Sequence, residues 1–219
     1  MNDKNLELIP DKDGFLFEIK DNIEITQHIM VLLVSFVGLI AIWVFGIGEG
    51  LELSKGDIYN RTSGTSILIV SSIYSIYKIL KHAKEPHKIL FYEHKIMKIS
   101  SSKEKSISTI NEIYKRPIII DFKGKVKRVS IFARFFLLLF FPITFIGLFF
   151  LYLSSVLFFR KLNYGYGLFL IGIDDFEIIS ILVEKDKEIV IENYFLKYYD
   201  FDIKNLQTTW FIPQKNNRG

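Results

Sequence analysis

The chain of 219 residues contains no cysteine, only five prolines and only two tryptophans. The absence of cysteine excludes disulfides, thiol catalysis and metal sites with cysteine ligands, although it does not fix the compartment. The sequence also lacks the phosphate-binding glycine loops, the GxSxG nucleophile motif and the HExxH zinc motif. These absences favour a protein that is not an enzyme and carries no cofactor.

Two stretches in the N-terminal third of the chain contain no charged residue. Residues 29–48 form a run of 20 residues, and residues 62–77 form a run of 16. A helix of 20 residues spans about 30 Å, the thickness of a bilayer core. The alternative for the first run is a buried core helix. We expect transmembrane helices at 29–48 and at 62–80, packed through Ser71 and Ser75 on one helix face.

The distribution of charge predicts the orientation of these helices. Residues 78–134 contain 15 Lys and Arg but only five Asp and Glu, whereas residues 1–28 contain seven acidic residues and three Lys. Basic residues near membrane spans stay in the cytoplasm. We therefore expect the N-terminus inside and residues 49–61 outside. Abundant Ile, Lys, Phe and Asn are typical of an AT-rich bacterial genome, which favours a multi-pass protein of a bacterial inner (plasma) membrane.

A third apolar segment, residues 131–160, has no charge between Arg134 and Arg160. As one helix its uncharged part would measure about 37 Å, enough for a tilted crossing but too short for two. Pro142 disfavours an uninterrupted helix, and a basic residue at each end suits two ends on the same leaflet. The sequence favours a re-entrant dip and leaves a single crossing open.

Strand patterns flank this third segment. The stretch LELIPDKDGFLFEIK predicts a hairpin that turns at residues 11–14. Further strands are expected within residues 88–100, 107–114, 117–131, 165–173 and 176–183. An amphipathic helix of 12 to 15 residues is predicted by helical spacing. Its apolar face would hold Val190, Ile191, Tyr194, Phe195 and Tyr198.

The stretch HKILFYEHKIMKIS, residues 87–100, resembles the opening hairpin of bacterial pleckstrin-homology-like (PH-like) proteins. The resemblance covers about residues 86–200. It implies an α+β integral membrane protein with an N-terminal pair of transmembrane helices. It also implies a small antiparallel sheet with a C-terminal helix, here interrupted by an apolar membrane segment. Some members of the family bind lipids or proteins, and the bacterial members share no catalytic residues.

Five segments follow from these patterns. They are an acidic β-hairpin segment at 1–28, a transmembrane helix pair at 29–81, the first half of a cytoplasmic β-rich domain at 82–130, a membrane-inserted helical segment at 131–160, and the second half of that domain with its C-terminal helix at 161–219.

Basic residues are the candidate lipid-binding or partner-binding residues. They are Lys78, Lys81, Lys84, Lys88, Lys123, Lys125, Lys127 and Arg128, with Lys95 and Lys98 in the same basic set. Each basic residue near an anionic leaflet contributes about 1 kcal/mol of attraction. The alternative is that these charges only keep the segment in the cytoplasm. No nucleic-acid motif accompanies them, so we expect membrane lipids, or a membrane protein, as partners.

Two groups of residues invite a metal interpretation. They are His82, His87 and His94 with Glu85 and Glu93, and the set Asp174, Asp175 and Glu177. The histidine spacings do not match the i, i+4 pair of a helical metal site. We expect solvated histidines beside the membrane, an ordinary acidic turn, and no metal.

The leading hypothesis is a non-enzymatic scaffold or binding protein that holds a PH-like domain at the cytoplasmic leaflet. One alternative is a small membrane immunity protein or an accessory subunit of a larger membrane complex. Another is an oligomeric channel or transporter. The absence of charge within residues 29–48 and 135–159 counts against transport.

Overall fold

A computed structural model describes residues 8–43, 55–100, 103–117, 149, 152–153, 156, 165–173, 177–209 and 212. The predictions for residues 118–148, and for Asp174 and Asp175, lie outside this described part.

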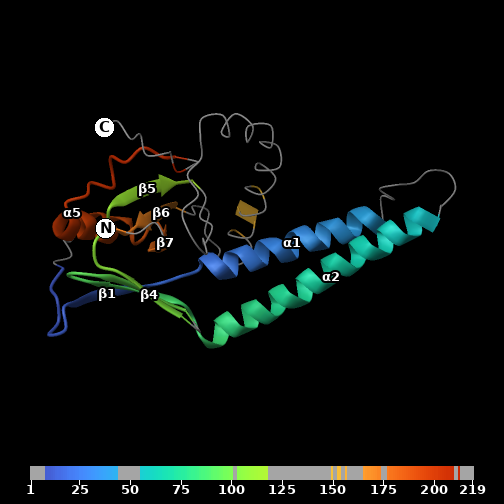
Figure 1. Ribbon diagram of the computed structural model, residues 1–219, viewed down its shortest axis with the longest axis horizontal. Helices are drawn as coiled ribbons and strands as arrows, with labels where there is room; N and C mark the ends of the chain where they lie inside the picture. Colours follow the sequence, from blue (N-terminus) through green and yellow to red (C-terminus); the bar gives the residue numbers. More distant parts are fainter. Residues whose placement is uncertain are drawn as a thin grey trace.

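The described chain is an α+β fold with two small antiparallel sheets (Figure 1). The first sheet has the order β1 (Phe15–Lys20), β2 (Lys88–Tyr92), β3 (Ile96–Ser100) and β4 (Lys103–Ile107), and the second has the order β5 (Glu112–Arg116), β6 (Tyr166–Ile171) and β7 (Ile178–Val183). The helices are α1 (Ile23–Trp43), α2 (Lys55–Lys84) and α5 (Glu188–Tyr199). The predicted α+β class is confirmed, but the strands form two sheets instead of one.

The strand expected at 107–114 is divided between the two sheets. β4 ends at Ile107 and β5 begins at Glu112, with a bend between them. Ile107, Ile110 and Ile113 are all buried in the same core, although they are three residues apart. Side chains on a straight strand alternate with a period of two, so only a bend lets all three face one core. The imperfect alternation in the sequence reflects this bend.

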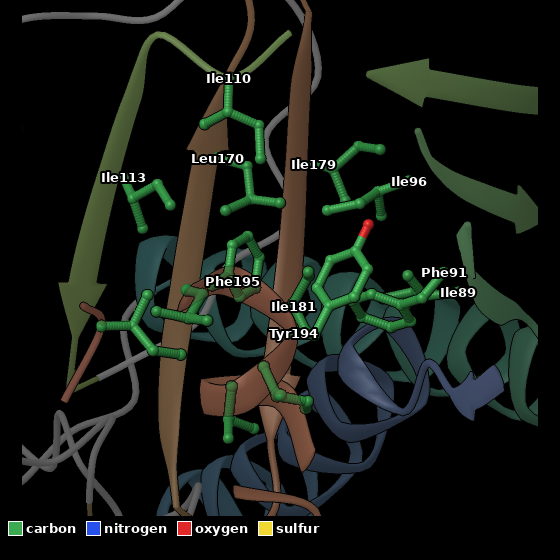
Figure 2. Close-up of a cluster of buried hydrophobic side chains, with 14 of the residues drawn as sticks. Ile89, Phe91, Ile96, Ile110, Ile113, Leu170, Ile179, Ile181, Tyr194 and Phe195 are labelled. Carbon is green, nitrogen blue, oxygen red and sulfur yellow. The ribbon is translucent and has the colours of Figure 1, made fainter. Parts of the chain in front are cut away.

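One hydrophobic core lies between the two sheets and α5 (Figure 2). Tyr194 and Phe195 project from α5 into this core and are fully buried, together with Ile191. The Tyr194 ring meets Phe91 of β2 edge-on at 4.9 Å, and its hydroxyl donates a hydrogen bond of 2.8 Å to the carbonyl of Tyr92. The predicted amphipathic helix is therefore confirmed, and it is the element that joins the two sheets.

The helical pair is inserted within the first sheet and does not simply precede the domain. β1 leads into α1, α2 leads into β2, and the two strands pair antiparallel with Lys20 opposite Lys88. The predicted turn forms at residues 11–14, where the Gly14 N–H donates to the Asp11 carbonyl at 3.0 Å. However, β1 pairs with β2 and not with the run before the turn. In that run residues 8–10 form no strand, and Leu8 packs into the core instead.

The two long helices pack against each other and project together away from the sheets (Figure 1). Gly38 lies at a close approach, because an added Cβ would be 3.0 Å from Leu68 Cδ1 and that side chain would have to shift. Ser75 is buried between the helices, as expected, and Trp43 Nε1 donates to Thr65 Oγ1 at 3.0 Å near their far end. Ile23–Trp43 and Arg61–Lys84 are long and apolar enough to cross a membrane.

The strand ends that connect to the two apolar parts of the chain lie at one end of the domain. Residues 118–164 connect β5 to β6, which are paired neighbours with Arg116 opposite Gly167. On the next strand, Leu182 packs against Ile23 at the start of α1. Asn22 Nδ2 donates a 3.2 Å hydrogen bond to Glu184 Oε1, just after β7. The open ends of β5 and β6 therefore lie beside the base of the helical pair.

Candidate functional site

A cluster of charged and polar side chains joins the base of the helical pair to the first sheet. We call it the junction cluster, and its members are Asp21, Glu24, His28, Ser75, Lys78, His82, His87 and Lys98. They come from the start of α1, the C-terminal part of α2, the residues that join these helices to β1 and β2, and β3. The cluster therefore forms only when the sheet and the helices are assembled.

Asp21 and Lys98 form an ion pair in the interior. Asp21 Oδ2 lies 2.7 Å from Lys98 Nζ, and the two side chains are only 1% and 7% exposed. Lys98 shares the buried side of β3 with Ile96. Asp21 Oδ1 also accepts a 3.2 Å hydrogen bond from the N–H of Ile23. An acidic residue at this position satisfies one of the free N–H groups of the first helical turn, so Asp21 fixes both the start of α1 and its place beside β3.

Glu24 is the centre of the rest of the cluster. Its Oε1 lies 3.0 Å from Lys78 Nζ of α2, and its Oε2 lies 3.3 Å from His87 Nδ1, immediately before β2. His28, one helical turn further along α1, lies 3.9 Å from the same carboxylate and 3.4 Å from Ser75 Oγ. One carboxylate thus connects α1, α2 and the segment entering β2.

The expectation of solvated histidines is wrong for two of the three. His82 and His87 are buried, and their ring centroids lie 4.8 Å apart in an edge-to-face arrangement. The chain turns back from α2 into β2 between them, which brings both rings under the sheet. His94 is exposed, as expected. Within the described ranges, no group of three or more His, Asp or Glu is arranged to hold a metal ion.

The basic residues predicted to bind lipid do not gather into one surface among the described residues. Lys78 is paired with Glu24, and Lys88 is paired with Glu18 at 2.9 Å. Lys81 and Lys84 lie in the last turns of α2 and form no ion pair in the part of the chain that the structure describes. Lys95 lies over the Tyr92 ring at 5.0 Å, and Lys98 is the buried partner of Asp21. Lys123, Lys125, Lys127 and Arg128 lie outside the described residues.

Sequence reasoning missed Asp21, Glu24 and His28. Glu24 and His28 lie four residues apart on one face of α1, and Asp21 lies two residues before the helix begins. Three polar, titratable residues directly before a long apolar run were the available signal. Their partners lie on α2, before β2 and on β3, and could not be read from the sequence without the pairing of β1 with β2.

Burial perturbs the pKa values of titratable groups outside the junction cluster. Burial raises the pKa of Tyr194, whose ring lies in the core. On the same helix, partial burial raises the pKa of the Glu192 carboxyl, and the neighbouring Glu188 adds to the effect. Burial lowers the pKa of Arg116, which stacks over Phe169 with its guanidinium carbon 5.9 Å from the ring centroid. Tyr194 packs in the interior and Arg116 packs against Phe169, whereas the charged form of Glu192 is disfavoured in the folded domain.

Comparisons of the chain with protein-family models, with curated proteins and with solved structures found no match. Its function is therefore inferred from its own residues and their arrangement.

Proposed function

We propose that the protein is a non-enzymatic, membrane-anchored scaffold that holds its α+β domain against the cytoplasmic leaflet of a bacterial inner membrane. In this proposal α1 and α2 cross the bilayer, and the domain binds a protein partner or anionic lipid. The observation that carries the proposal is the insertion of the helical pair between β1 and β2, two paired neighbours of one sheet.

The surface of the helical pair supports the membrane location. Large apolar side chains point outward along both helices, with Phe36, Val70 and Ile73 each more than 60% exposed. Contiguous apolar surface of this extent is rare on soluble monomers and typical of an interaction surface or a membrane. α1 contains 21 residues, which corresponds to about 31 Å and matches a bilayer core.

The helical pair is attached to the sheet by two short connections, and this supports a scaffold with a fixed orientation. Asp21 and Asn22 alone separate β1 from α1, and Glu85–His87 separate α2 from β2. The junction cluster then ties both connections to the sheet through the Asp21–Lys98 and Glu24–His87 contacts. A domain held in this way cannot swing on a flexible linker, so its binding surfaces keep one angle to the membrane.

The strand order supports the PH-like part of the proposal. Four antiparallel strands, three antiparallel strands and a closing C-terminal helix follow one another along the chain. The helical pair interrupts this order between β1 and β2, and residues 118–164 interrupt it between β5 and β6. Because β5 and β6 are paired, a single crossing within 131–160 would separate neighbours of one sheet by a bilayer. This geometry supports the re-entrant dip.

Cysteine labelling in intact cells tests the membrane arrangement, because the natural chain contains no cysteine. Tyr59 is exposed near the start of α2, and Lys185 is exposed in the domain. We expect an impermeant maleimide to label Tyr59→Cys in intact cells and Lys185→Cys only after permeabilisation. Labelling of Lys185→Cys in intact cells would refute the cytoplasmic domain.

Purification tests the binding role. The full chain, extracted in mild detergent, should retain a stoichiometric protein partner, or it should bind anionic lipid in preference to neutral lipid in reconstituted vesicles. A partner retained at fixed stoichiometry would select the scaffold or accessory-subunit form of the proposal. If the chain retains no partner and shows no preference for anionic over neutral lipid, the binding role is wrong.

A further inference from the structure

A groove opens where the end of β1 meets the end of β7. We call it the junction groove, and it has a volume of about 350 Å³. It is lined by Glu18, Ile19, Lys20, Asn22, Leu182, Glu184 and Lys187. Asn22 directly precedes α1, so the groove lies at the end of the domain from which the helical pair projects.

We propose that the junction groove binds the phosphate of an anionic phospholipid headgroup through Lys20 and Lys187. This inference rests on the proposed membrane location and names a lipid site within it. The two lysines belong to β1 and to the turn before α5. Neither belongs to the basic set that the sequence suggested.

The groove contains two lysines and two glutamates, and one of the glutamates is paired with a lysine outside it. Glu18 is held by Lys88, whose Nζ lies 2.9 and 3.0 Å from the two carboxylate oxygens. Glu184 accepts the 3.2 Å hydrogen bond from Asn22. In contrast, the ammonium groups of Lys20 and Lys187 are exposed and form no ion pair or hydrogen bond within the described part of the chain. An anion entering the groove would therefore meet two ammonium groups that no carboxylate in the described part of the chain holds, beside the charged Glu184 carboxylate, which accepts a hydrogen bond from the Asn22 amide.

The floor of the groove is apolar. Ile19 and Leu182 lie between the charged walls, and each is 7% exposed. An apolar floor suits the glycerol carbons next to a headgroup phosphate, and reduced solvation there strengthens the attraction between phosphate and ammonium. A free inorganic phosphate would use the lysines but not this floor.

The position of the groove favours a lipid over a soluble anion. Ile23, the first residue of α1, packs against Leu182 in the groove floor. When α1 enters the bilayer, the groove lies at the depth of the headgroups of the same leaflet. Lysines at this depth act in the negative surface potential of anionic lipids, where each contributes about a fivefold change in affinity.

Calorimetric titration of the full chain in neutral detergent tests this site. The probe is dihexanoyl-phosphatidylglycerol, and dihexanoyl-phosphatidylcholine and inorganic phosphate serve as comparison ligands. We expect phosphatidylglycerol to bind most tightly, and the double variant Lys20→Gln/Lys187→Gln to weaken its binding by about 2- to 30-fold, because each exposed ion pair contributes about 0.2–1 kcal/mol. The variant Lys20→Arg/Lys187→Arg, which keeps both charges, should retain binding.

A matched control separates the groove from general attraction. Lys12 and Lys103 are exposed lysines outside the groove, and Lys12→Gln/Lys103→Gln removes the same charge. This control should change binding by less than about twofold, because screening at the Debye length of about 8 Å weakens distant charges. Equal losses in both double variants would overturn the site, and so would inorganic phosphate binding as tightly as the lipid. If wild-type protein binds no phosphatidylglycerol, the lipid site is wrong, whereas cysteine labelling still decides the membrane arrangement independently.

Discussion

Removing one partner of the Asp21–Lys98 pair should destabilise the joint between the helices and the sheet strongly, because it leaves an unpaired charge in the interior. Lys98→Met keeps most of the side-chain volume but leaves the Asp21 carboxylate without its partner in a site where it is 1% exposed. Breaking a buried ion pair by removing one partner costs about 3–5 kcal/mol. At about 2–4 °C per kcal/mol for a chain of this size, we expect the melting temperature to fall by about 6–20 °C.

A second pair provides the matched control. Lys88 and Glu18 lie 2.9 Å apart, but their side chains are 42% and 48% exposed. Exposed pairs contribute about 0.2–1 kcal/mol, so Lys88→Met should lower the free energy of unfolding by less than about 1 kcal/mol. The two lysines occupy neighbouring strands, and the comparison therefore isolates burial as the variable.

The double variant Asp21→Asn/Lys98→Met completes the test. It removes both charges, so the loss should be smaller than the sum of the two single losses by at least about 1 kcal/mol. The assay is urea unfolding of the full chain in detergent micelles, followed by circular dichroism. The reasoning is refuted if Lys98→Met is as stable as Lys88→Met, or if the single losses add.

Three further predictions concern the domain. Gly165 has φ of +72° and an added Cβ would overlap the carbonyl oxygen of Val183, so Gly165→Ala should lower the free energy of unfolding by about 1–3 kcal/mol in a urea titration; an unchanged midpoint would contradict the backbone geometry. Tyr194→Phe removes the donor to the Tyr92 carbonyl and should cost about 1–2 kcal/mol in the same assay; no loss would mean that the hydroxyl is dispensable. The pKa of Glu192 is raised above its ordinary value of 4.5, so the contribution of this carboxyl to stability should fall as pH rises from that value through the folded-state pKa. Glu192→Gln should therefore be more stable than wild type at pH 7 but equal to it at pH 3.5. A gain in stability that is independent of pH would rule out this carboxyl as the cause.

Elements defined by local periodicity could be predicted from the sequence. α5 was predicted because Ile191, Tyr194 and Phe195 follow the helical period, and these are the residues it buries. β2 and β3 were also predicted from a local signal, the two short apolar runs on either side of a polar turn. In each case the signal and the structure depend on neighbouring residues.

Features that depend on distant pairing could not be predicted. The turn at residues 11–14 favoured a local hairpin, because closing a short loop costs less entropy than closing a long one. β1 nevertheless pairs with β2, since the packed helical pair brings the two strands together. The contacts of Asp21 with Lys98 and of Glu24 with His87 follow from that pairing. The junction cluster therefore had no complete signature in the sequence.

The insertion of the helical pair into the first sheet also sets an order of events during synthesis. β1 emerges early, but its partner follows only after residues 21–87 have been made. Until then β1 has no neighbouring strand, while α1 and α2 can already pack against each other. If the helical pair inserts as proposed, β1 would join β2 only after that insertion, and a failed insertion would leave β1 without its partner strand.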